Sequence, residues 1–449
     1  MAALPRFPDD FLWGTSTAAY QIEGAVRKGG RGASIWDTFS HTEGRTRDGD
    51  TGDVACDHYH RWAEDVALLA DLGVNAYRFS VAWPRIQPDG TGPANPAGLD
   101  FYDRLVDALA ERGITALPTL YHWDLPQALE DEGGWLNRQT ALRFGDYAAL
   151  VADRLGDRVG RWITLNEPFV TMALGYSLGQ HAPGVAIGIN ALPAAHHQLL
   201  GHGLAAAQLR SRGLQVMVAN SCTPVRTASD SEPDVAAAEA YDALHNRLFN
   251  DPLLLGSYPD LSAYDAPPQD SYVQDGDLAL ISAPLEALGV NYYHPTVIRA
   301  ADPAEQAASG LPFTRLPIDD VPTTAFGWPV VPAGLTELLV GLRERYGAAL
   351  PPIIITENGC SAPDKVDAGG EVHDADRIEF LDGHLRALHD AITAGVDVRG
   401  YMVWSLLDNF EWAEGYSQRF GLVRTDYDTL ERTPKDSFAW YRDVLAAQR

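Results

Sequence analysis

The sequence lacks any long apolar run. None of its stretches approaches the ~18 consecutive apolar residues that a membrane-spanning helix needs, so we expect neither a membrane span nor a membrane partner. The start, MAALPRFPDDFLWG, has no basic segment followed by an apolar stretch, and we expect a cytoplasmic protein rather than a secreted one. Only three cysteines occur, Cys56, Cys222 and Cys360, and an odd number so far apart argues against a disulfide framework.

Positive charge is also scarce. The chain has 34 Lys and Arg against 61 Asp and Glu, a formal net charge of −27. The acidic residues are spread along the sequence rather than collected in a tail. Such a surface repels phosphate backbones, so we expect no nucleic-acid partner.

Motifs for metals and cofactors are missing. The histidine groups His58/His60 and His196/His197/His202 have no carboxylate or cysteine partner at a recognised ligand spacing. No GxGxxG-type loop opens a helix, which disfavours a nucleotide cofactor. We therefore expect neither a metal nor a cofactor.

Short apolar runs that alternate with helical patterns are what the sequence does have. We predict strands near 11–17, 74–80, 114–121, 160–166, 215–220, 288–293, 352–357 and 399–405. Repeated βα units indicate a parallel sheet, and eight of them predict an α/β fold, a (β/α)8 TIM barrel. The spacing of Tyr59, Trp62, Val66 and Leu69 predicts a helix with Asp57 as its N-cap, and a second helix closes on Gly113.

The sequence gives no indication of a domain boundary, because no low-complexity or Pro/Ser-rich linker divides the chain. The stretches 36–56, 259–285, 303–333 and 360–373 are irregular, and we interpret them as long loops above the barrel. We therefore predict one domain over 1–449, with a pocket formed by these loops at the carboxyl ends of the strands. Polar residues collect at those ends: Arg78, His122, Asn166, Glu167, Asn291, Tyr293 and Glu357.

Two of these residues are glutamates that end apolar strands. Glu167 lies in WITLNEP and Glu357 in IIITENG. Cleavage of a glycosidic bond needs one carboxylic acid to protonate the leaving oxygen and one carboxylate to attack or stabilise the anomeric carbon. Either glutamate alone is as well explained as a solvated strand end. The pair predicts a glycosidase.

The neighbouring motifs strengthen this prediction. They are FLWGTSTAAYQIEGA (11–25), RFSVAWPRI (78–86), LYHWDLP (120–126), TLNEP (164–168), GVNYY (289–293), TENG (356–359), WSLLDNFEW (404–412) and FGLVRTDY (420–427). With them the chain resembles the β-glucosidases of glycoside hydrolase family 1 over almost its whole length.

The resemblance implies a nucleophile at Glu357, a general acid/base at Glu167 and net retention of anomeric configuration. Retention requires the two carboxyl groups to lie ~5–5.5 Å apart. The resemblance also implies that Arg78 and Tyr293 lie beside Glu357, where they favour its anionic form. The pKa of Glu167 is then expected to be raised. The alternatives are a structural ion pair for Arg78 and core packing for Tyr293.

Residues for sugar recognition follow from the same resemblance. It implies that the glycone hydroxyls bind Gln21, His122, Asn166, Glu411 and Trp412, that Trp404 is the stacking platform, and that Asn291 supports Asn166 or Glu357. A donor at Asn166 to the 2-hydroxyl gains strength in the transition state. Taken singly, His122 and Trp404 are better explained as core residues.

The outer part of the predicted site is less well defined. Trp328 resembles the tryptophan that contacts the aglycone, although loop aromatics often only pack. Phospho-specific relatives replace the Glu411-Trp412 pair by a Ser/Lys/Tyr set, and here Phe420 stands where they have a tyrosine. An unphosphorylated glycone is favoured, with Arg419 as the one nearby cation. Cys360 is either an accessible thiol near the site or a small buried hydrophobe.

The sequence therefore predicts a retaining exo-β-glucosidase that acts on β-glucosides and cello-oligosaccharides, with a place in cellulose and polysaccharide degradation. Side activity on galactosides and fucosides and transglycosylation are compatible with it, because Glu411 is expected to contact both the 4- and the 6-hydroxyl. A catalytically silent carbohydrate-binding barrel is the alternative from another class. Such proteins typically lose one carboxylate, and this sequence has both.

Overall fold

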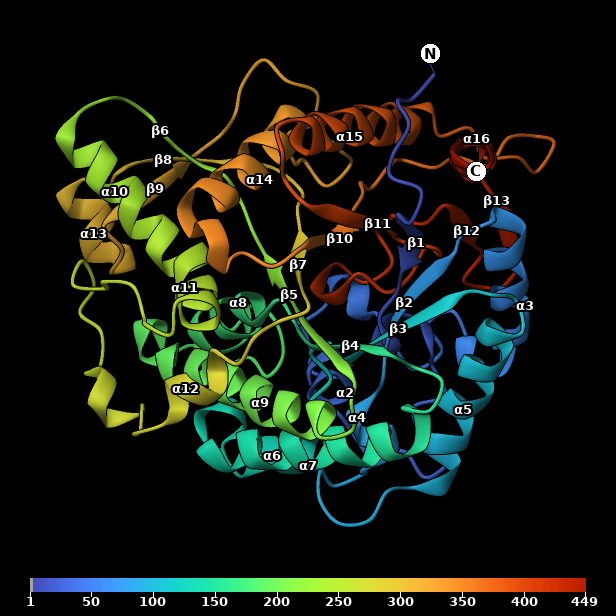
Figure 1. The fold of residues 1–449 in the computed structure, drawn as a ribbon, viewed down its shortest axis with the longest axis horizontal. Helices are drawn as coiled ribbons and strands as arrows, with labels where there is room; N and C mark the ends of the chain where they lie inside the picture. Colours follow the sequence, from blue (N-terminus) through green and yellow to red (C-terminus); the bar gives the residue numbers. More distant parts are fainter. Residues whose placement is uncertain (1–2) are drawn as a thin grey trace.

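A closed barrel of eight parallel strands forms the centre of the computed structural model, which describes residues 3–449 (Figure 1). The strands follow one another around the barrel in the order β1-β11-β10-β7-β5-β4-β3-β2. Their bounds are β1 Leu12–Ser16, β2 Ala76–Ser80, β3 Thr115–Tyr121, β4 Arg161–Asn166, β5 Gln215–Ser221, β7 Ala287–Asn291, β10 Ile353–Asn358 and β11 Val398–Trp404. Each of the eight predicted strands is present, with bounds that differ by at most two residues. The predicted TIM barrel is confirmed.

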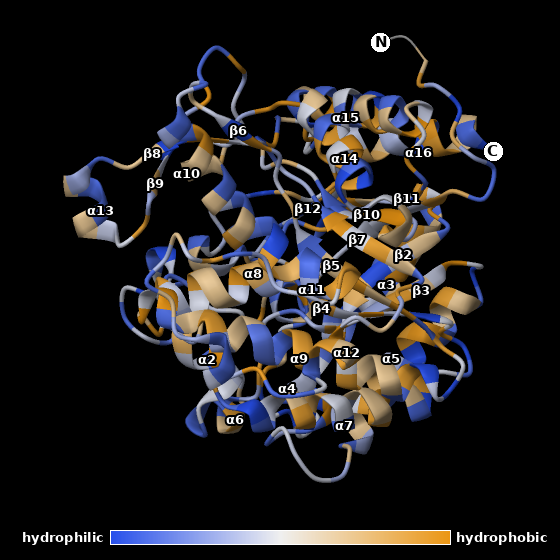
Figure 2. Cartoon of the chain, turned by 60° about the vertical axis from the view of Figure 1, so that its left-hand side comes forward, coloured by the Kyte–Doolittle hydropathy of each residue, from blue (hydrophilic) through white to orange (hydrophobic). Residues whose placement is uncertain are grey.

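The inside of the barrel is filled by apolar side chains from alternate strand positions, as expected for this fold. They are Ala76, Leu117, Ile163, Met217, Ala219, Ala287, Ile354 and Met402. Gly14 on β1 leaves room for this filling, because a Cβ there would lie 2.3 Å from the Met402 sulfur. The strands are mostly orange in Figure 2, since both of their faces are covered.

A ring of helices surrounds the barrel (Figure 1). Its long members are α3 His58–Leu72, α5 Pro96–Ala110, α7 Arg138–Leu155, α9 Leu192–Arg210, α14 Ala333–Tyr346, α15 Ala375–Thr393 and α16 Asp436–Gln448. After β5 come α10 Glu232–Asp242, α11 Leu248–Leu254 and α12 Asp277–Ile281. Most of α9 is buried, because it packs between the barrel and α7.

Short elements occupy the loops at the two ends of the barrel. They are α1 Ala19–Ile22, α2 Ile35–Ser40, η1 Arg47–Gly49, α4 Trp83–Ile86, α6 Gln127–Asp131, η2 Gly134–Leu136, α8 Pro168–Val170, η3 Thr171–Ser177, η4 Gly188–Ala191, η5 Ala243–Arg247, η6 Gln269–Ser271, α13 Pro303–Ser309, η7 Gly347–Ala349, η8 Trp412–Glu414, β6 Val225–Thr227, β8 Thr296–Ala300, β9 Phe313–Leu316, β12 Val423–Thr425 and β13 Arg432–Pro434. Among the described helices, none combines the length and the apolar character that crossing a bilayer requires.

The structure tests two helix-end predictions. Asp57 is the N-cap residue of α3, as predicted, and its carbonyl accepts from the Arg61 N–H at 3.0 Å. Its backbone is left-handed, and its carboxylate contacts His60 Nδ1 at 2.6 Å and no helix N–H, so the cap has no side-chain hydrogen bond. Helix α5 ends at Ala110, and Gly113 takes φ +68° with its N–H bonded to the Ala110 carbonyl. Glycine tolerates this left-handed turn, which closes the helix as expected.

Three of the four stretches that we interpreted as loops are more regular than expected, and 360–373 is a loop without helix or strand, as predicted. The range 303–333 contains α13 and β9, 36–56 contains η1 and most of α2, and 259–285 contains η6 and α12. Strand β9 pairs with β8, which pairs with β6, in a three-stranded sheet beside the barrel. A four-residue strand with a charged residue, FTRL, carries too little alternation to be recognised in the sequence.

Candidate active site

A pocket of about 560 Å³ lies at the carboxyl ends of the barrel strands. Ten of the residues that the sequence predicted line it: His122, Glu167, Asn291, Tyr293, Trp328, Glu357, Trp404, Glu411, Trp412 and Phe420. The other three, Gln21, Arg78 and Asn166, lie behind the wall and hydrogen-bond to residues that line it. The structure thus brings every predicted site residue together, and both glutamates face one cavity.

Glu357 ends β10 and is held by donors on both carboxylate oxygens. Arg78 Nη1 donates to Oε1 at 2.7 Å, and the Tyr293 hydroxyl donates to Oε2 at 2.8 Å. The ion pair is almost fully buried, with the Arg78 side chain 1% and the Glu357 side chain 5% exposed. A cation and a hydroxyl therefore stabilise the ionised form of this carboxyl.

Glu167 follows β4 directly, and fewer hydrogen-bond donors contact its carboxyl group. Its backbone takes φ +44°, a left-handed conformation that a residue with a side chain adopts only when its surroundings impose it. Its N–H bonds to the Ala219 carbonyl at 2.8 Å, which ties it to β5. Its Oε1 accepts one hydrogen bond, from the Asn291 amide at 2.9 Å.

This difference in hydrogen-bond donors determines which of the two glutamates ionises first. Burial and the charge of Glu357 raise the pKa of Glu167 to about 8. Burial also raises the pKa of Glu357, but Arg78 and Tyr293 act against it. A full cation and a hydroxyl outweigh one neutral amide, so Glu357 ionises first and Glu167 keeps its proton at neutral pH.

A chain of polar side chains joins the two glutamates and fixes a histidine tautomer. Asn166 Oδ1 accepts from Arg78 Nη2 at 2.6 Å and from Asn291 Nδ2 at 3.0 Å. The Asn166 amide nitrogen must then donate to His122 Nε2, 2.9 Å away. His122 is neutral, because burial and Arg78 hold its pKa well below the usual value. Its proton therefore lies on Nδ1, which is buried without a partner among the described residues and is free to donate to a ligand.

Gln21 and Glu411 form a second polar group at the pocket. Gln21 Nε2 donates to Asn409 Oδ1 at 3.0 Å and to the Phe410 carbonyl at 2.9 Å. This leaves the Gln21 Oε1 as a buried acceptor to which no described residue donates. Burial and the charge of Glu357 raise the pKa of Glu411 to about 8. An amide oxygen and a carboxyl side by side suit the paired hydroxyls of a sugar.

Aromatic rings cover the remaining walls. The ring of Trp404 lies 5.7 Å from that of His122 at an angle of 29°, and Trp412 packs against Trp123 at 4.6 Å. Gly359 lets β10 approach this wall, because a Cβ there would lie 1.8 Å from the Trp404 carbonyl oxygen. The Trp404–Ser405 peptide bond is cis. Flat apolar rings beside hydroxyl-binding groups are the combination that a pyranose ring requires.

We call the residues around the two glutamates the floor of the pocket and the outer residues its mouth. The floor comprises Gln21, Arg78, His122, Asn166, Glu167, Asn291, Tyr293, Glu357, Trp404, Glu411 and Trp412. The mouth comprises Phe169, Tyr241, His245, Arg315, Phe326, Trp328 and Phe420. Trp328 belongs to it as predicted, stacked on Phe326 at 4.4 Å.

Sequence reasoning missed most of the mouth. Trp123 and Phe169 stand beside motif residues, in HWDLP and after NEP, so adjacency to the motifs would have found them. His245 comes from η5 and Arg315 from β9, and neither carries a motif. Both reach the pocket only through the packing of the small sheet and the helices after β5.

Several residues that had two interpretations are now placed. Arg419 pairs with Asp408 at 2.8 Å and is not part of the pocket wall. Cys360 is 3% exposed, and burial raises the pKa of its thiol to about 12, so it is the small buried hydrophobe. The predicted absence of a disulfide holds for all three cysteines, which are free and buried.

Groups that could hold a metal lie away from the pocket. The histidines at 58, 196, 197 and 202 hydrogen-bond to separate partners, namely Asp65, Asp277, the Trp135 carbonyl and Thr164. Among residues 3–449, one exposed trio, Asp367, Glu371 and His373, has ligand atoms within 4.8 Å of one another. It shares no residue with the pocket wall.

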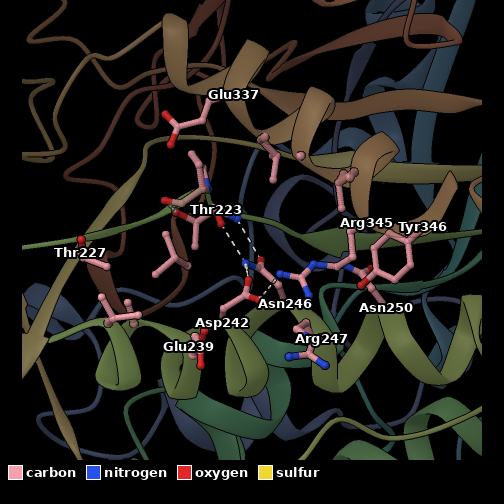
Figure 3. A pocket seen from close by; sticks show the side chains of 17 residues that line it. Thr223, Thr227, Glu239, Asp242, Asn246, Arg247, Asn250, Glu337, Arg345 and Tyr346 are labelled. Carbon is pink, nitrogen blue, oxygen red and sulfur yellow. Dashed lines mark hydrogen bonds and ion pairs between the residues drawn. The ribbon is translucent and has the colours of Figure 1, made fainter. Parts of the chain in front are cut away.

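A second pocket of about 330 Å³ lies between α10, η5 and α14 (Figure 3). Both arginines that line it are paired: Arg345 with Asp242 at 3.2 Å, and Arg247 with Asp251 at 3.1 Å. Asn246 donates to Asp242 and to the Thr223 carbonyl. No pair of carboxyl groups with opposed environments occurs there, so the chemistry belongs to the larger pocket.

Comparison with known proteins agrees with this geometry. The family model described as Glycosyl hydrolase family 1 matches residues 4–449. The "Thermostable beta-glucosidase B" of Thermobispora bispora is 52% identical over 98% of this chain and 90% of its own length. The "Bifunctional beta-D-glucosidase/beta-D-fucosidase" of Bifidobacterium breve is 49% identical over 98% of both chains.

Solved structures give the same result. The psychrophilic β-glucosidase BglU from Micrococcus antarcticus superposes with a TM-score of 0.95 at 46% identity, over 99% of this chain and 98% of that one. The β-glucosidase from Thermotoga maritima in complex with glucoimidazole superposes with a TM-score of 0.93 at 44% identity, over 99% of both chains.

Proposed function

As the chain belongs to glycosyl hydrolase family 1, we propose that it is a retaining exo-β-glucosidase, with Glu357 as nucleophile and Glu167 as acid/base. The enzyme is a hydrolase of O-glycosyl bonds. The observation that carries the residue roles is the contrast between the two glutamates: Glu357 accepts from a cation and a hydroxyl, and Glu167 from one amide.

The first half-reaction uses this contrast directly. Glu357 Oε attacks the anomeric carbon, while Glu167 gives its proton to the glycosidic oxygen and the aglycone leaves. The bond to the aglycone breaks as the ester bond to Glu357 forms. Protonation by a carboxyl with a pKa of about 8 is available at neutral pH.

The second half-reaction reverses the role of Glu167. Once Glu357 is an ester it carries no charge, and the Coulombic contribution that raised the pKa of Glu167 disappears. Burial still raises the pKa of Glu167, but the pKa is lower than before, so Glu167 loses its proton more readily. Its carboxylate takes a proton from water, which attacks the anomeric carbon and releases the sugar with its original configuration.

Recognition of the sugar is assigned to the rest of the floor. Asn166 has one amide hydrogen on His122 and a second one free, which we assign to the 2-hydroxyl, where a hydrogen bond strengthens in the transition state. His122 Nδ1 and Gln21 Oε1 supply a free donor and a free acceptor. Trp404 supplies the apolar face.

The substrate class that we propose is terminal, non-reducing β-D-glucosyl residues of β-glucosides and cello-oligosaccharides, with weaker activity on fucosides and galactosides and some transglycosylation. The Bifidobacterium breve relative, named for glucosidase and fucosidase activity, supports the fucoside part. Phe420 and the paired Arg419 disfavour a 6-phosphorylated glycone, because no cation faces the sugar beside Glu411.

A glycone panel tests this proposal. kcat/KM is measured on 4-nitrophenyl β-glucoside, β-fucoside, β-galactoside and 6-phospho-β-glucoside, and proton NMR follows the first sugar anomer released. We expect β-glucose first, and the 6-phospho substrate to be the poorest. Release of α-glucose from the β-glucoside would refute retention, and no turnover of any glycoside would favour a silent binding protein.

We further propose that residues 1–449 act as one catalytic domain in the cytoplasm. Three free, buried cysteines support a reducing compartment. A single calorimetric unfolding transition and recovery in the cytosolic fraction of the source cells are the expected results. Two separate transitions would refute the single domain, and recovery in the secreted fraction would refute the location.

A further inference from the structure

Arg315 is the only lysine or arginine among the described residues that line the active-site pocket. It is exposed and lies on β9, opposite Ile298 of β8. Within residues 3–449 no carboxylate lies within ion-pair distance of it. Its charge acts on Tyr241, His245 and His294, whose pKa values it lowers. In a chain with a net charge of −27, a cation without an anionic partner at a pocket is unusual.

Other arginines near Arg315, in contrast, have anionic partners. On the same three-stranded sheet, Arg299 pairs with Glu305 at 2.6 Å and Arg226 pairs with Glu337 at 2.6 Å. The arginines of the second pocket are paired as well, as with Arg345 and Asp242 in Figure 3. Arg315 alone of this group has its charge directed to a cavity that can receive a ligand.

A buried histidine beside Arg315 points into the same cavity. His245 is 9% exposed and lines the pocket, and its Nε2 is buried without a partner among the described residues. Its Nδ1 lies 3.1 Å from the Tyr241 hydroxyl. Burial lowers the pKa of His245, so the imidazole is neutral. We assign the Tyr241 proton to the bond with Nδ1, which places the imidazole proton on Nε2 as a second donor toward the cavity.

The walls around these donors are aromatic. Phe169, two residues beyond Glu167, packs against the His245 ring, with the ring centroids 3.9 Å apart and the planes tilted by 34°. Trp328 lies across the mouth against His294 at 5.6 Å. The acids that line the pocket lie elsewhere: three belong to the floor, and Glu414 pairs with Arg47. The mouth thus joins an aromatic slot to a cation and a neutral N–H donor, whereas the floor is acidic.

We propose that the mouth is a subsite for an aromatic aglycone that carries a carboxylate, with Arg315 as the residue that binds this carboxylate and selects for it. The inference rests on the proposed function, because it names the leaving group of the same reaction. An ion pair between a guanidinium and a carboxylate, aided by His245 Nε2–H, forms while the glucosyl group occupies the floor. Arg315 therefore determines specificity and takes no part in bond breaking.

A matched pair of substrates tests the proposal. One is 4-(carboxymethyl)phenyl β-D-glucoside and the other its neutral amide, 4-(carbamoylmethyl)phenyl β-D-glucoside. The methylene group insulates the phenol, so the leaving groups are almost equally acidic. The readout is the ratio of kcat/KM for the anionic substrate to that for the neutral one, in which leaving-group chemistry cancels.

In Arg315→Gln we expect this ratio to fall about fivefold, the effect of an ion pair at a partly exposed site. Arg315→Glu should lower it further, Arg315→Lys should restore part of it, and added salt should lower the wild-type ratio toward that of Arg315→Gln. The matched control is Arg299→Gln, which removes the same charge from the neighbouring strand and outside the pocket; its ratio should equal that of the wild type.

A wild-type ratio unchanged in Arg315→Gln, or lowered equally in Arg299→Gln, would overturn the proposal. The proposed function is judged separately by the neutral substrate. If the wild-type enzyme fails to hydrolyse the neutral glucoside, the glucosidase assignment is wrong, whereas hydrolysis with an unchanged ratio removes only the role of Arg315.

Discussion

The floor and the mouth of the pocket are built in different ways. Most floor residues come from the ends of barrel strands, and those around the two glutamates form a connected polar network: Arg78 contacts Glu357 and Asn166, and Asn291 contacts Asn166 and Glu167. Mouth residues come from η5, the small sheet and the loops, and they contact one another mainly through rings. The floor is fixed by the barrel, and the mouth is free to differ.

This difference separates chemistry from selection. A buried network holds each charge in one place and shifts pKa values, because the alternative is an unpaired charge away from water. An aromatic mouth with one exposed cation has little effect on the activation barrier of the chemical steps, but it discriminates among leaving groups. Changes in the floor should therefore affect kcat on every substrate, and changes in the mouth should affect the ranking of aglycones.

The largest expected effect is the loss of the nucleophile. Glu357→Gly should lower kcat by about five orders of magnitude on every β-glucoside, because no covalent intermediate can form. Azide should restore turnover with activated substrates and yield the α-glucosyl azide by a single inversion. The control is Glu414→Gln, a glutamate of the same pocket that pairs with Arg47. If the loss is equal in both variants, the pocket tolerates no charge change and Glu357 has no special role.

Loss of the acid/base comes next and depends on the leaving group. Glu167→Ala should lower kcat/KM about 10³-fold on substrates with poorly acidic leaving groups and little on 2,4-dinitrophenyl glucoside, which needs no protonation. Glu167 acts as the protonated form, so wild-type kcat/KM should fall as the pH rises through about 8. This alkaline limb should vanish in the variant. A limb that persists unchanged would assign it to another group, such as Glu411.

Tyr293→Phe tests whether the Tyr293 hydroxyl stabilises the ionised form of Glu357. It removes the 2.8 Å hydrogen bond to Glu357 and leaves the Arg78 contact, so the pKa of Glu357 should rise. Glu357 acts ionised, and the acid limb of kcat/KM should shift to higher pH, with a loss of about tenfold at neutral pH. Lower activity with the acid limb in its wild-type place would mean that Tyr293 serves packing instead.

The smallest effect is expected in the mouth. Trp328→Ala should raise KM for aryl glucosides about fivefold and leave inhibition by free glucose unchanged, because glucose occupies only the floor. Trp328→Phe keeps a ring and should recover most of the loss. A matching rise in the inhibition constant of glucose would show that floor and mouth are coupled, against the distinction drawn above.

The sequence predicted most of the floor well, because most of its members lie at or directly after the end of a strand whose apolar run is easily recognised. Glu357 after PIIIT and Glu167 after WITLN are examples, and parallel strands must deliver their carboxyl ends to one side. The resemblance to a known family added Gln21 and Glu411, which no strand pattern indicates.

The mouth escaped prediction for physical reasons. Arg315 lies in a four-residue strand within a segment that we took for a loop, and His245 lies in a π-helical turn that sequence periodicity does not register. Their places depend on long-range packing of β6, β8 and β9. The sequence placed the N-cap of α3 at Asp57 correctly, but it could not show that the carboxylate contacts His60 instead of a helix N–H.

Trapping of the covalent intermediate tests the central claim most directly. The enzyme is incubated with 2,4-dinitrophenyl 2-deoxy-2-fluoro-β-D-glucoside. Its fluorine slows both half-reactions, and its reactive leaving group keeps the first one fast enough for the intermediate to accumulate. The labelled peptide is mapped by mass spectrometry. We expect one sugar per chain, on Glu357. A label on Glu167 or any other residue, or one equivalent of dinitrophenol released without a label, would contradict the account.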